Sequence, residues 1–170
     1  MKIGPISDEA FDLPEEIIEK YKIGVARFKI DLQELKNLPG NIYQKTREAE
    51  RQGIKSVVKT SQPSINDFLS IFKEKLNEFE EVFCVTISSK LSGTYNAAVQ
   101  AKKFLQKEFQ DKVHVIDSLN GSAGQGLVVL KIIELAKRNL NSQEINNKIK
   151  ESIEKTKLLG MYHDPKWLKA

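Results

Sequence analysis

The feature that most constrains the fold is residues 82–87, Val-Phe-Cys-Val-Thr-Ile, where apolar side chains would cover both faces of a strand. A strand buried on both faces is typical of the centre of a parallel sheet that helices cover on each side. A turn rich in serine, glycine and threonine follows at residues 88–96, and a helical pattern continues through residues 97–109. The sequence therefore predicts a central strand, a polar turn and a helix, in that order.

The polar turn is a candidate anion site. Backbone N–H groups at the start of a helix lack intrahelical partners. Together with the helix dipole and nearby hydroxyls, they favour a carboxylate or a phosphate. A second interpretation is that Ser92 or Thr94 only caps the helix, which is the commoner use of such residues. The turn alone leaves both interpretations open.

Strand-like and helix-like segments alternate along the chain, which favours an α/β fold with three layers, α/β/α, and a mainly parallel sheet. Besides the central run, strands are expected at residues 2–6, 23–30 and 113–116. Residues 54–58 fit either a short strand or an extended link. In such sheets, ligands bind beyond the carboxyl ends of the strands, at the point where the strand order reverses.

Apolar residues at helical spacing, together with capping signals, predict the helices. They are expected from Asp12 as N-cap with Pro14 in the first turn, over residues 42–52, from the Ser64–Asp67 capping pair onward, and from the Asn141–Glu144 pair onward. Residues 127–133 are apolar almost all round, as in a buried helix.

Polar residues follow three of the expected strands, as Ser7-Asp8, Ser88-Ser89 and Asp117-Ser118. Thr60 and Ser61 are expected in a further loop, just before the helix cap at Ser64. Because the carboxyl ends of parallel strands meet at one edge of a sheet, we expect these groups to face one crevice.

Composition argues against several classes of protein. The net charge is +4, but most lysines are interleaved with glutamates, as on solvated helix faces, which argues against nucleic-acid binding. No apolar run approaches the ~20 residues that span a bilayer, and the first residues lack signal-peptide character. The single cysteine, Cys84, permits no internal disulfide. We expect a cytoplasmic protein with no metal and no other cofactor.

No arrangement of nucleophile and base is evident in the sequence. His114 falls within an expected strand and reads as structural, His163 has no visible partner, and Cys84 reads as a small core residue. Asp8 and Asp117 are a weak magnesium signal, because no phosphate-binding loop accompanies them.

Three motifs resemble the DegV family in order and spacing. They are Thr60-Ser61-Gln62-Pro63-Ser64, then residues 87–95 (Ile-Ser-Ser-Lys-Leu-Ser-Gly-Thr-Tyr), then residues 115–118 (Val-Ile-Asp-Ser) with Ser122, Gly124 and Gly126. Asp8 and Asp12-Leu13-Pro14 resemble the family's opening D-x-x-x-D-L-P. The resemblance covers residues 1–155, the family's first domain, while residues 156–170 resemble the entry into a truncated second domain.

The resemblance implies a lipid-binding protein rather than an enzyme. Family members bind a long-chain fatty acid between two domains, and some present it to a bacterial fatty acid kinase. By resemblance, Thr60, Ser61 and Ser92 hold the carboxylate, with Gly93 and Thr94 in the same turn. The acyl chain would lie in an apolar tunnel, and the helix at residues 127–133 is a candidate wall beside its expected role in core packing. Without the second domain, we expect weak or no fatty-acid binding by this chain alone.

Two departures from the family pattern concern charge. Glu9 stands where serine is common, and Ala26-Arg27 stands where a Pro-Leu pair is frequent. A carboxylate at Glu9 would repel an anionic head group if it pointed inward.

Two other functions remain open. A small phosphate-binding enzyme could use the Ser92-Gly93-Thr94 turn. Alternatively, the chain could be a homodimerising interaction module that uses residues 158–167, which include Leu158 and Trp167, because exposed apolar side chains commonly mark a contact surface.

Overall fold

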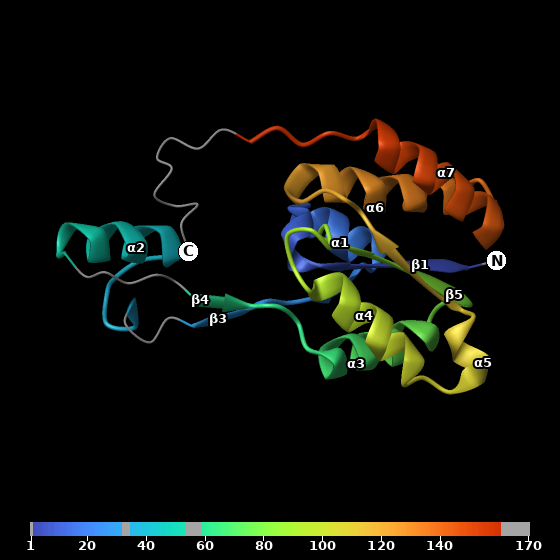
Figure 1. Ribbon diagram of the computed structural model, residues 1–170, viewed down its shortest axis with the longest axis horizontal. Helices are drawn as coiled ribbons and strands as arrows, with labels where there is room; N and C mark the ends of the chain where they lie inside the picture. The colour runs from blue at the N-terminus through green and yellow to red at the C-terminus, as the bar shows by residue number, and fades with distance from the viewer. Residues whose placement is uncertain (1, 32–34, 54–58, 161–170) are drawn as a thin grey trace. The chain divides into compact units, whose positions relative to one another are not determined.

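The computed structural model describes residues 2–31, 35–53 and 59–160 (Figure 1). The chain forms two compact units. The first unit comprises residues 1–27 and 62–159, and the second comprises residues 28–61 and 160–170. The division into residues 1–155 and 156–170 stays a prediction, and most of the proposed dimerising segment lies outside the described residues.

The first unit is built on a parallel sheet with the order β2 (Gly24–Ala26), β1 (Ile3–Asp8), β5 (Glu81–Thr86), β6 (Val113–Asp117). After β1 the chain moves outward to β2, and after β5 it moves outward in the other direction to β6. The strand order therefore reverses between β1 and β5. The expected central strand is confirmed, since β5 is buried along nearly its whole length.

Helices cover both faces of this sheet (Figure 1). One face carries α1 (Glu15–Tyr21), α6 (Ser122–Lys137) and α7 (Ser142–Lys155). The other carries α3 (Ile65–Leu76) and α4 (Thr94–Lys103), followed by the short α5 (Lys107–Gln110). Each face has its own apolar core, so the predicted three-layer arrangement is confirmed.

The second unit contains a two-stranded antiparallel sheet and one helix. Its strands are β3 (Lys29–Asp31) and β4 (Lys59–Ser61), and its helix is α2 (Ile42–Arg51), which starts with a capping box between Asn41 and Gln44. The single strand expected over residues 23–30 is therefore wrong, because its two ends belong to β2 and β3 in different sheets. Thr60 and Ser61 lie on strand β4 instead of in a loop. Residues 54–58, the expected strand or link, lie outside the described residues.

Two capping predictions are confirmed and one is wrong. Both the Ser64–Asp67 and the Asn141–Glu144 pairs form capping boxes. Asp12 caps no helix, because it adopts a left-handed conformation (φ 48°) and its carboxylate accepts a hydrogen bond from the Ser122 hydroxyl at 2.5 Å. The first turn after β1 is instead the 3-10 helix η1 (Glu9–Phe11), which the Asp8 side chain caps.

The helix expected over residues 97–109 begins earlier and is interrupted. It starts at Thr94 and ends at Lys103, and α5 begins only at Lys107. Between them Phe104 is exposed while Leu105 is buried, so the break lets Leu105 reach the core.

No helix in the described part of the chain has the length and apolar character to cross a bilayer.

Helix α6 begins at Ser122, five residues before the apolar run that predicts it, and so includes Gly124 and Gly126. A β-carbon at Gly126 would lie 2.6 Å from the backbone oxygen of Phe11. Only glycine therefore lets α6 approach η1 this closely. The run at residues 127–133 packs mainly into the core, although Leu127 is exposed.

We expect Gly126→Ala to lower the free energy of unfolding by about 1–3 kcal/mol, because the new methyl overlaps backbone that cannot rotate away. Gly121→Ala is the matched control, since its β-carbon would meet only Ile87 side-chain atoms at 3.6 Å and beyond, an ordinary contact distance. Urea unfolding of both variants measures the difference. Equal stability of the two variants would contradict the close approach.

Candidate functional site

The site begins at the carboxyl end of β1, where the strand order reverses. Asp8 is fully buried and accepts hydrogen bonds on both carboxylate oxygens. Oδ2 accepts from the Ile87 N–H at 2.7 Å, and Oδ1 accepts from the Ala10 N–H at 3.0 Å and from Gln125 Nε2 at 3.1 Å. The Asp8 side chain therefore joins β1 to the loop that follows β5 and to helix α6.

The same loop is held from the other side by β6. The Asp117 Oδ1 atom accepts from the Ser89 N–H at 3.1 Å and from the Leu119 N–H at 3.0 Å. Between these two carboxylate contacts, the Ser88 N–H donates to the backbone oxygen of Asn120 at 2.8 Å. The expected meeting of polar strand ends is confirmed for β1, β5 and β6, but the carboxylates face backbone donors of the loop.

The Ser92-Gly93-Thr94 turn forms the start of α4. Gly93 is the N-cap, and the Ser92 hydroxyl accepts from the Thr94 N–H at 3.3 Å and contacts the Thr94 hydroxyl oxygen at 2.8 Å. Thr94 is fully buried, whereas Ser92 is only partly buried. Ser92 thus satisfies one N–H of the first turn, in agreement with the capping interpretation, and it keeps an accessible face.

Three N–H groups of this turn have no hydrogen-bond partner among the described residues. They belong to Gly93, Tyr95 and Asn96, at the N-terminus of α4. Such free donors carry partial positive charge and lie where the helix dipole favours an anion. The turn therefore has the chemistry of an anion site in addition to its capping role.

Thr60 and Ser61 belong to the second unit, whereas Ser92, Gly93 and Thr94 belong to the first. Both are exposed residues of β4, where Thr60 is paired with Ile30 and Ser61 with Lys29. The pairing of β3 with β4 uses backbone groups, so it does not occupy the two hydroxyls. The predicted cradle is thus divided between two units.

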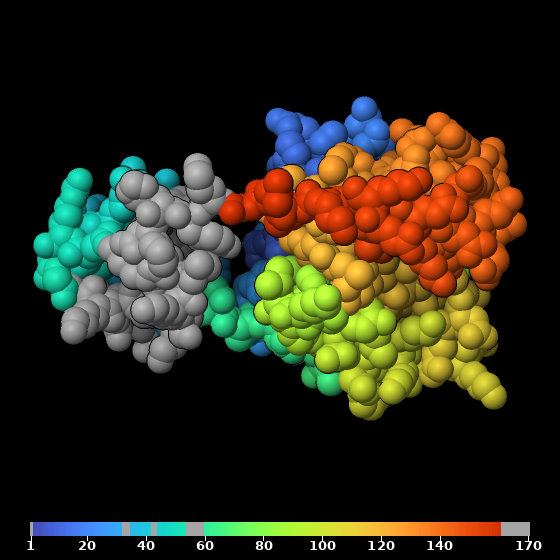
Figure 2. Space-filling model, turned by 45° about the horizontal axis from the view of Figure 1, so that its top comes forward, coloured from blue at the N-terminus to red at the C-terminus, as the bar shows by residue number. Residues whose placement is uncertain are grey.

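A groove of about 550 Å³ runs along the same edge of the first unit. It lies between the β5–α4 loop, the β6–α6 loop and the chain that follows α7, and Figure 2 shows the loop in yellow-green and the chain after α7 in red on one face. Leu91, Leu119 and Leu158 line it, and each is at least 46% exposed. Exposed leucines gathered in one groove are typical of a binding surface.

Glu9 and Arg27, the two charged residues that depart from the family pattern, form an ion pair. Arg27 donates to the Glu9 carboxylate at 3.1 Å. The negative charge of Glu9 is therefore paired with Arg27, which reduces the repulsion that an unpaired carboxylate would exert on an anion.

Burial raises the pKa of two ionisable groups in the sheet, one on β1 and one on β5. Desolvation raises the pKa of the Asp8 carboxyl above its ordinary value, although its hydrogen bonds with Ile87, Gln125 and Ala10 oppose the rise. Burial also raises the pKa of the Cys84 thiol well above its ordinary value. Cys84 is thus a protonated core residue, as its sequence position predicts, since thiolates and not thiols are nucleophilic.

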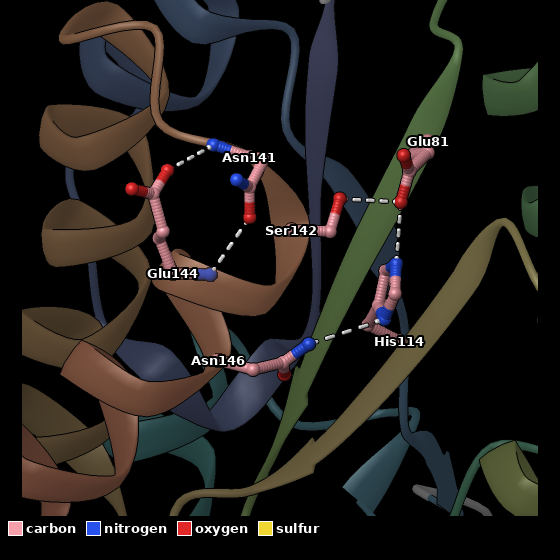
Figure 3. A network of polar contacts seen from close by, with 6 residues as sticks. All are labelled: Glu81, His114, Asn141, Ser142, Glu144 and Asn146. Atoms are coloured by element: carbon pink, nitrogen blue, oxygen red, sulfur yellow. Dashed lines mark hydrogen bonds and ion pairs between the residues drawn. The ribbon is translucent and has the colours of Figure 1, made fainter.

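His114 lies in a separate polar network at the opposite edge of the sheet (Figure 3). Its Nε2 atom contacts Glu81 Oε2 at 2.6 Å, its Nδ1 atom contacts Asn146 Nδ2 at 3.3 Å, and its ring stacks on Phe83. The Ser142 hydroxyl also donates to Glu81 Oε2, at 2.5 Å. Nδ1 thus contacts α7 and Nε2 contacts β5, which is the structural role expected from the sequence.

Comparison with known proteins identifies the family. The family model described as "Uncharacterised protein, DegV family" matches residues 2–170. The chain belongs to the DegV family.

Its DegV relatives include proteins described by what they bind. A fatty acid-binding protein of Thermotoga maritima is 31% identical over 96% of this chain and 57% of its own length. The solved structure of a fatty-acid-binding DegV family protein from Thermus thermophilus matches with a TM-score of 0.78 and 26% identity, over 91% of this chain and 54% of that chain. A DegV lipid binding protein from T. maritima matches with a TM-score of 0.74 and 31% identity, over 91% and 55%. The chain spans about half the length of the relatives it matches.

Sequence reasoning missed two side chains near the carboxyl ends of the strands. Gln125 is fully buried, and its Nε2 atom donates to Ser7 and Asp8, while its Oε1 atom has no partner among the described residues. Asn120 is buried and its side chain donates to the backbone oxygen of Ser118. The available signal for these roles was a glutamine and an asparagine beside a run of apolar residues, because a buried side-chain amide has a hydrogen-bond partner in most proteins.

The described residues contain no group of three or more His, Cys, Asp or Glu arranged to hold a metal ion.

The raised pKa of Asp8 predicts a pH-dependent difference between the wild-type chain and Asp8→Asn. A carboxyl with a folded-state pKa above its unfolded value contributes stability at low pH and loses it as the pH rises through the folded-state value. We therefore expect the free energy of unfolding of the wild type, minus that of Asp8→Asn, to fall as the pH rises from about 4 to about 7. Urea unfolding across that range measures it. A difference that rises with pH would contradict the assignment.

Proposed function

We propose that this chain is the head-group-binding half of a fatty-acid-binding protein and performs no catalysis of its own. The observation that carries the proposal is the set of free N–H donors at the start of α4, beside the partly buried Ser92 hydroxyl. Relatives at 31% identity that are described as fatty acid- or lipid-binding support the choice of ligand.

In this proposal the carboxylate binds at the N-terminus of α4. The Ser92 hydroxyl and the N–H groups of Gly93 and Tyr95 would donate hydrogen bonds to it. A charge-assisted hydrogen bond contributes about 1.5–3 kcal/mol, and the helix dipole adds about 0.3–1 kcal/mol at an exposed site. Thr94 would act from behind, since its buried hydroxyl contacts Ser92. The assignment of Thr60 and Ser61 to the carboxylate rests on the family resemblance alone.

The acyl chain would use the leucine-lined groove that adjoins the turn. Leu91 is next to Ser92 in the sequence, and Lys90 lines the same groove with a positive charge that favours an anionic ligand. Each methylene removed from water contributes about 0.8 kcal/mol. The groove is partly open to solvent, so this chain alone would recover only part of that energy. We therefore expect weak binding by the isolated chain.

A fatty acid kinase is the partner that this function implies. A carrier that holds the carboxylate at an edge of its sheet, instead of deep in the core, leaves that group within reach of an enzyme that phosphorylates it. The proposal assigns the chemistry to the kinase and only the presentation to this chain.

Laurate tests the head-group site, because it is soluble enough to measure weak binding. In ¹H–¹⁵N NMR titrations we expect laurate to shift the amide signals of Gly93, Thr94 and Tyr95. Ser92→Ala should weaken laurate binding by about tenfold, the loss expected for one hydrogen bond to a charged group. Ser70→Ala is the matched control, because Ser70 is exposed on α3.

Inorganic phosphate in parallel titrations separates this function from a phosphate-binding enzyme. Phosphate that shifts the same amides more strongly than laurate would contradict the lipid proposal. Mass spectrometry of the purified chain provides a second check, since about one co-purified fatty acid per chain would contradict weak binding.

A further inference from the structure

We propose that Asp8 and Asp117 are positioning residues, which hold the β5–α4 loop from the two neighbouring strands so that the Ser92 turn is ordered before any ligand arrives. This inference rests on the proposed function for the identity of the ligand, but the ordering itself is a property of the free chain. We refer to the two side chains as the carboxylate clamp.

Each carboxylate holds a different amide of the same loop. Asp8, at the end of β1, accepts from the Ile87 N–H at 2.7 Å, and Asp117, at the end of β6, accepts from the Ser89 N–H at 3.1 Å. Because β1 and β6 flank β5 on opposite sides, the two contacts fix the loop against sideways movement in both directions.

The loop then carries this order to the turn through its own hydrogen bonds. The backbone oxygen of Ser88, the residue between the two held amides, accepts from the N–H groups of Leu91 at 2.9 Å and Ser92 at 3.1 Å. The Ser88 hydroxyl accepts from the Lys90 N–H at 3.2 Å. The position of Ser92 therefore depends directly on that of Ser88.

The surroundings of Asp8 indicate that its charge serves this purpose. The carboxylate is fully buried, and desolvation raises its pKa, so a neutral residue would be easier to bury. Gln125 turns its amide nitrogen toward Asp8 while its own Oε1 has no partner among the described residues. A buried carboxylate and an amide oxygen without a partner each destabilise the fold. A need for acceptors on both oxygens of Asp8 explains why both are present.

The two carboxylates differ in a way that makes the proposal testable. Asp8 accepts on both oxygens, so an asparagine could serve only one of its two sides. Asp117 accepts both of its bonds on Oδ1, so an asparagine with its carbonyl in that place could keep them. Asp117→Asn is therefore a matched control for Asp117→Ala.

Amide hydrogen exchange of the ligand-free chain, measured by NMR, tests the clamp. In Asp117→Ala we expect the Ser89 amide to exchange about tenfold faster or more, and in Asp117→Asn we expect it to exchange as in the wild type. In Asp8→Ala the Ile87 amide should exchange faster by a similar factor, while the Val85 amide within β5 changes much less. Should Asp8→Ala fail to fold, the Asp117 pair decides, because Asp117→Ala removes the acceptor of the Ser89 amide and Asp117→Asn can keep it.

Uniform acceleration of all amides, or unchanged exchange at both Ile87 and Ser89, would overturn the proposal. A laurate titration of the same variants then tests positioning, with binding at least about threefold weaker in Asp117→Ala than in Asp117→Asn. Equal affinities in these two variants would also overturn it. If the wild type binds no laurate, the proposed function fails, and the exchange rates alone decide whether the clamp exists.

Discussion

The hydrogen bond between the buried Asp8 carboxylate and the Ile87 amide is the interaction on which the rest of this edge depends. It lies where the strand order reverses, so the chain leaves β1 and β5 in opposite directions and no regular sheet partner is available for the first amide after β5. A buried N–H without an acceptor is costly. A carboxylate that accepts on both oxygens satisfies this donor together with those of η1 and α6.

Close packing of α6 makes that arrangement possible. Gly126 brings the helix against the backbone of Phe11, and the preceding residue, Gln125, donates to the Asp8 carboxylate from the same helix. Carboxylates at the strand ends thus accept hydrogen bonds from loop N–H groups. Among the described residues, the N–H groups without a partner remain at the N-terminus of α4. The Asp8 carboxylate is buried, and the free N–H donors carry partial positive charge at the N-terminus of α4.

Acidic side chains have local partners at both ends of the sheet. At the carboxyl edge, Glu9 pairs with Arg27, so two departures from the family pattern compensate each other. At the opposite edge, Glu81 accepts from both Ser142 and His114, which fixes the start of α7 to the strands (Figure 3). These ionisable side chains, which the sequence leaves as candidates for binding or catalysis, are therefore paired with other side chains in the fold.

The sequence alone determined the layered α/β fold, the buried central strand and most helix starts, because apolar periodicity and capping pairs such as Ser64–Asp67 are local signals. It also indicated that Ser7-Asp8, Ser88-Ser89 and Asp117-Ser118 would gather at one edge, because parallel strands share their carboxyl ends. Only the tertiary structure decided what those groups do. Asp12 turns to Ser122 instead of capping a helix, Gln125 reaches Asp8, and Thr60 and Ser61 fall on a strand of a separate unit. These outcomes depend on contacts between residues far apart in the chain, and no local pattern encodes such contacts.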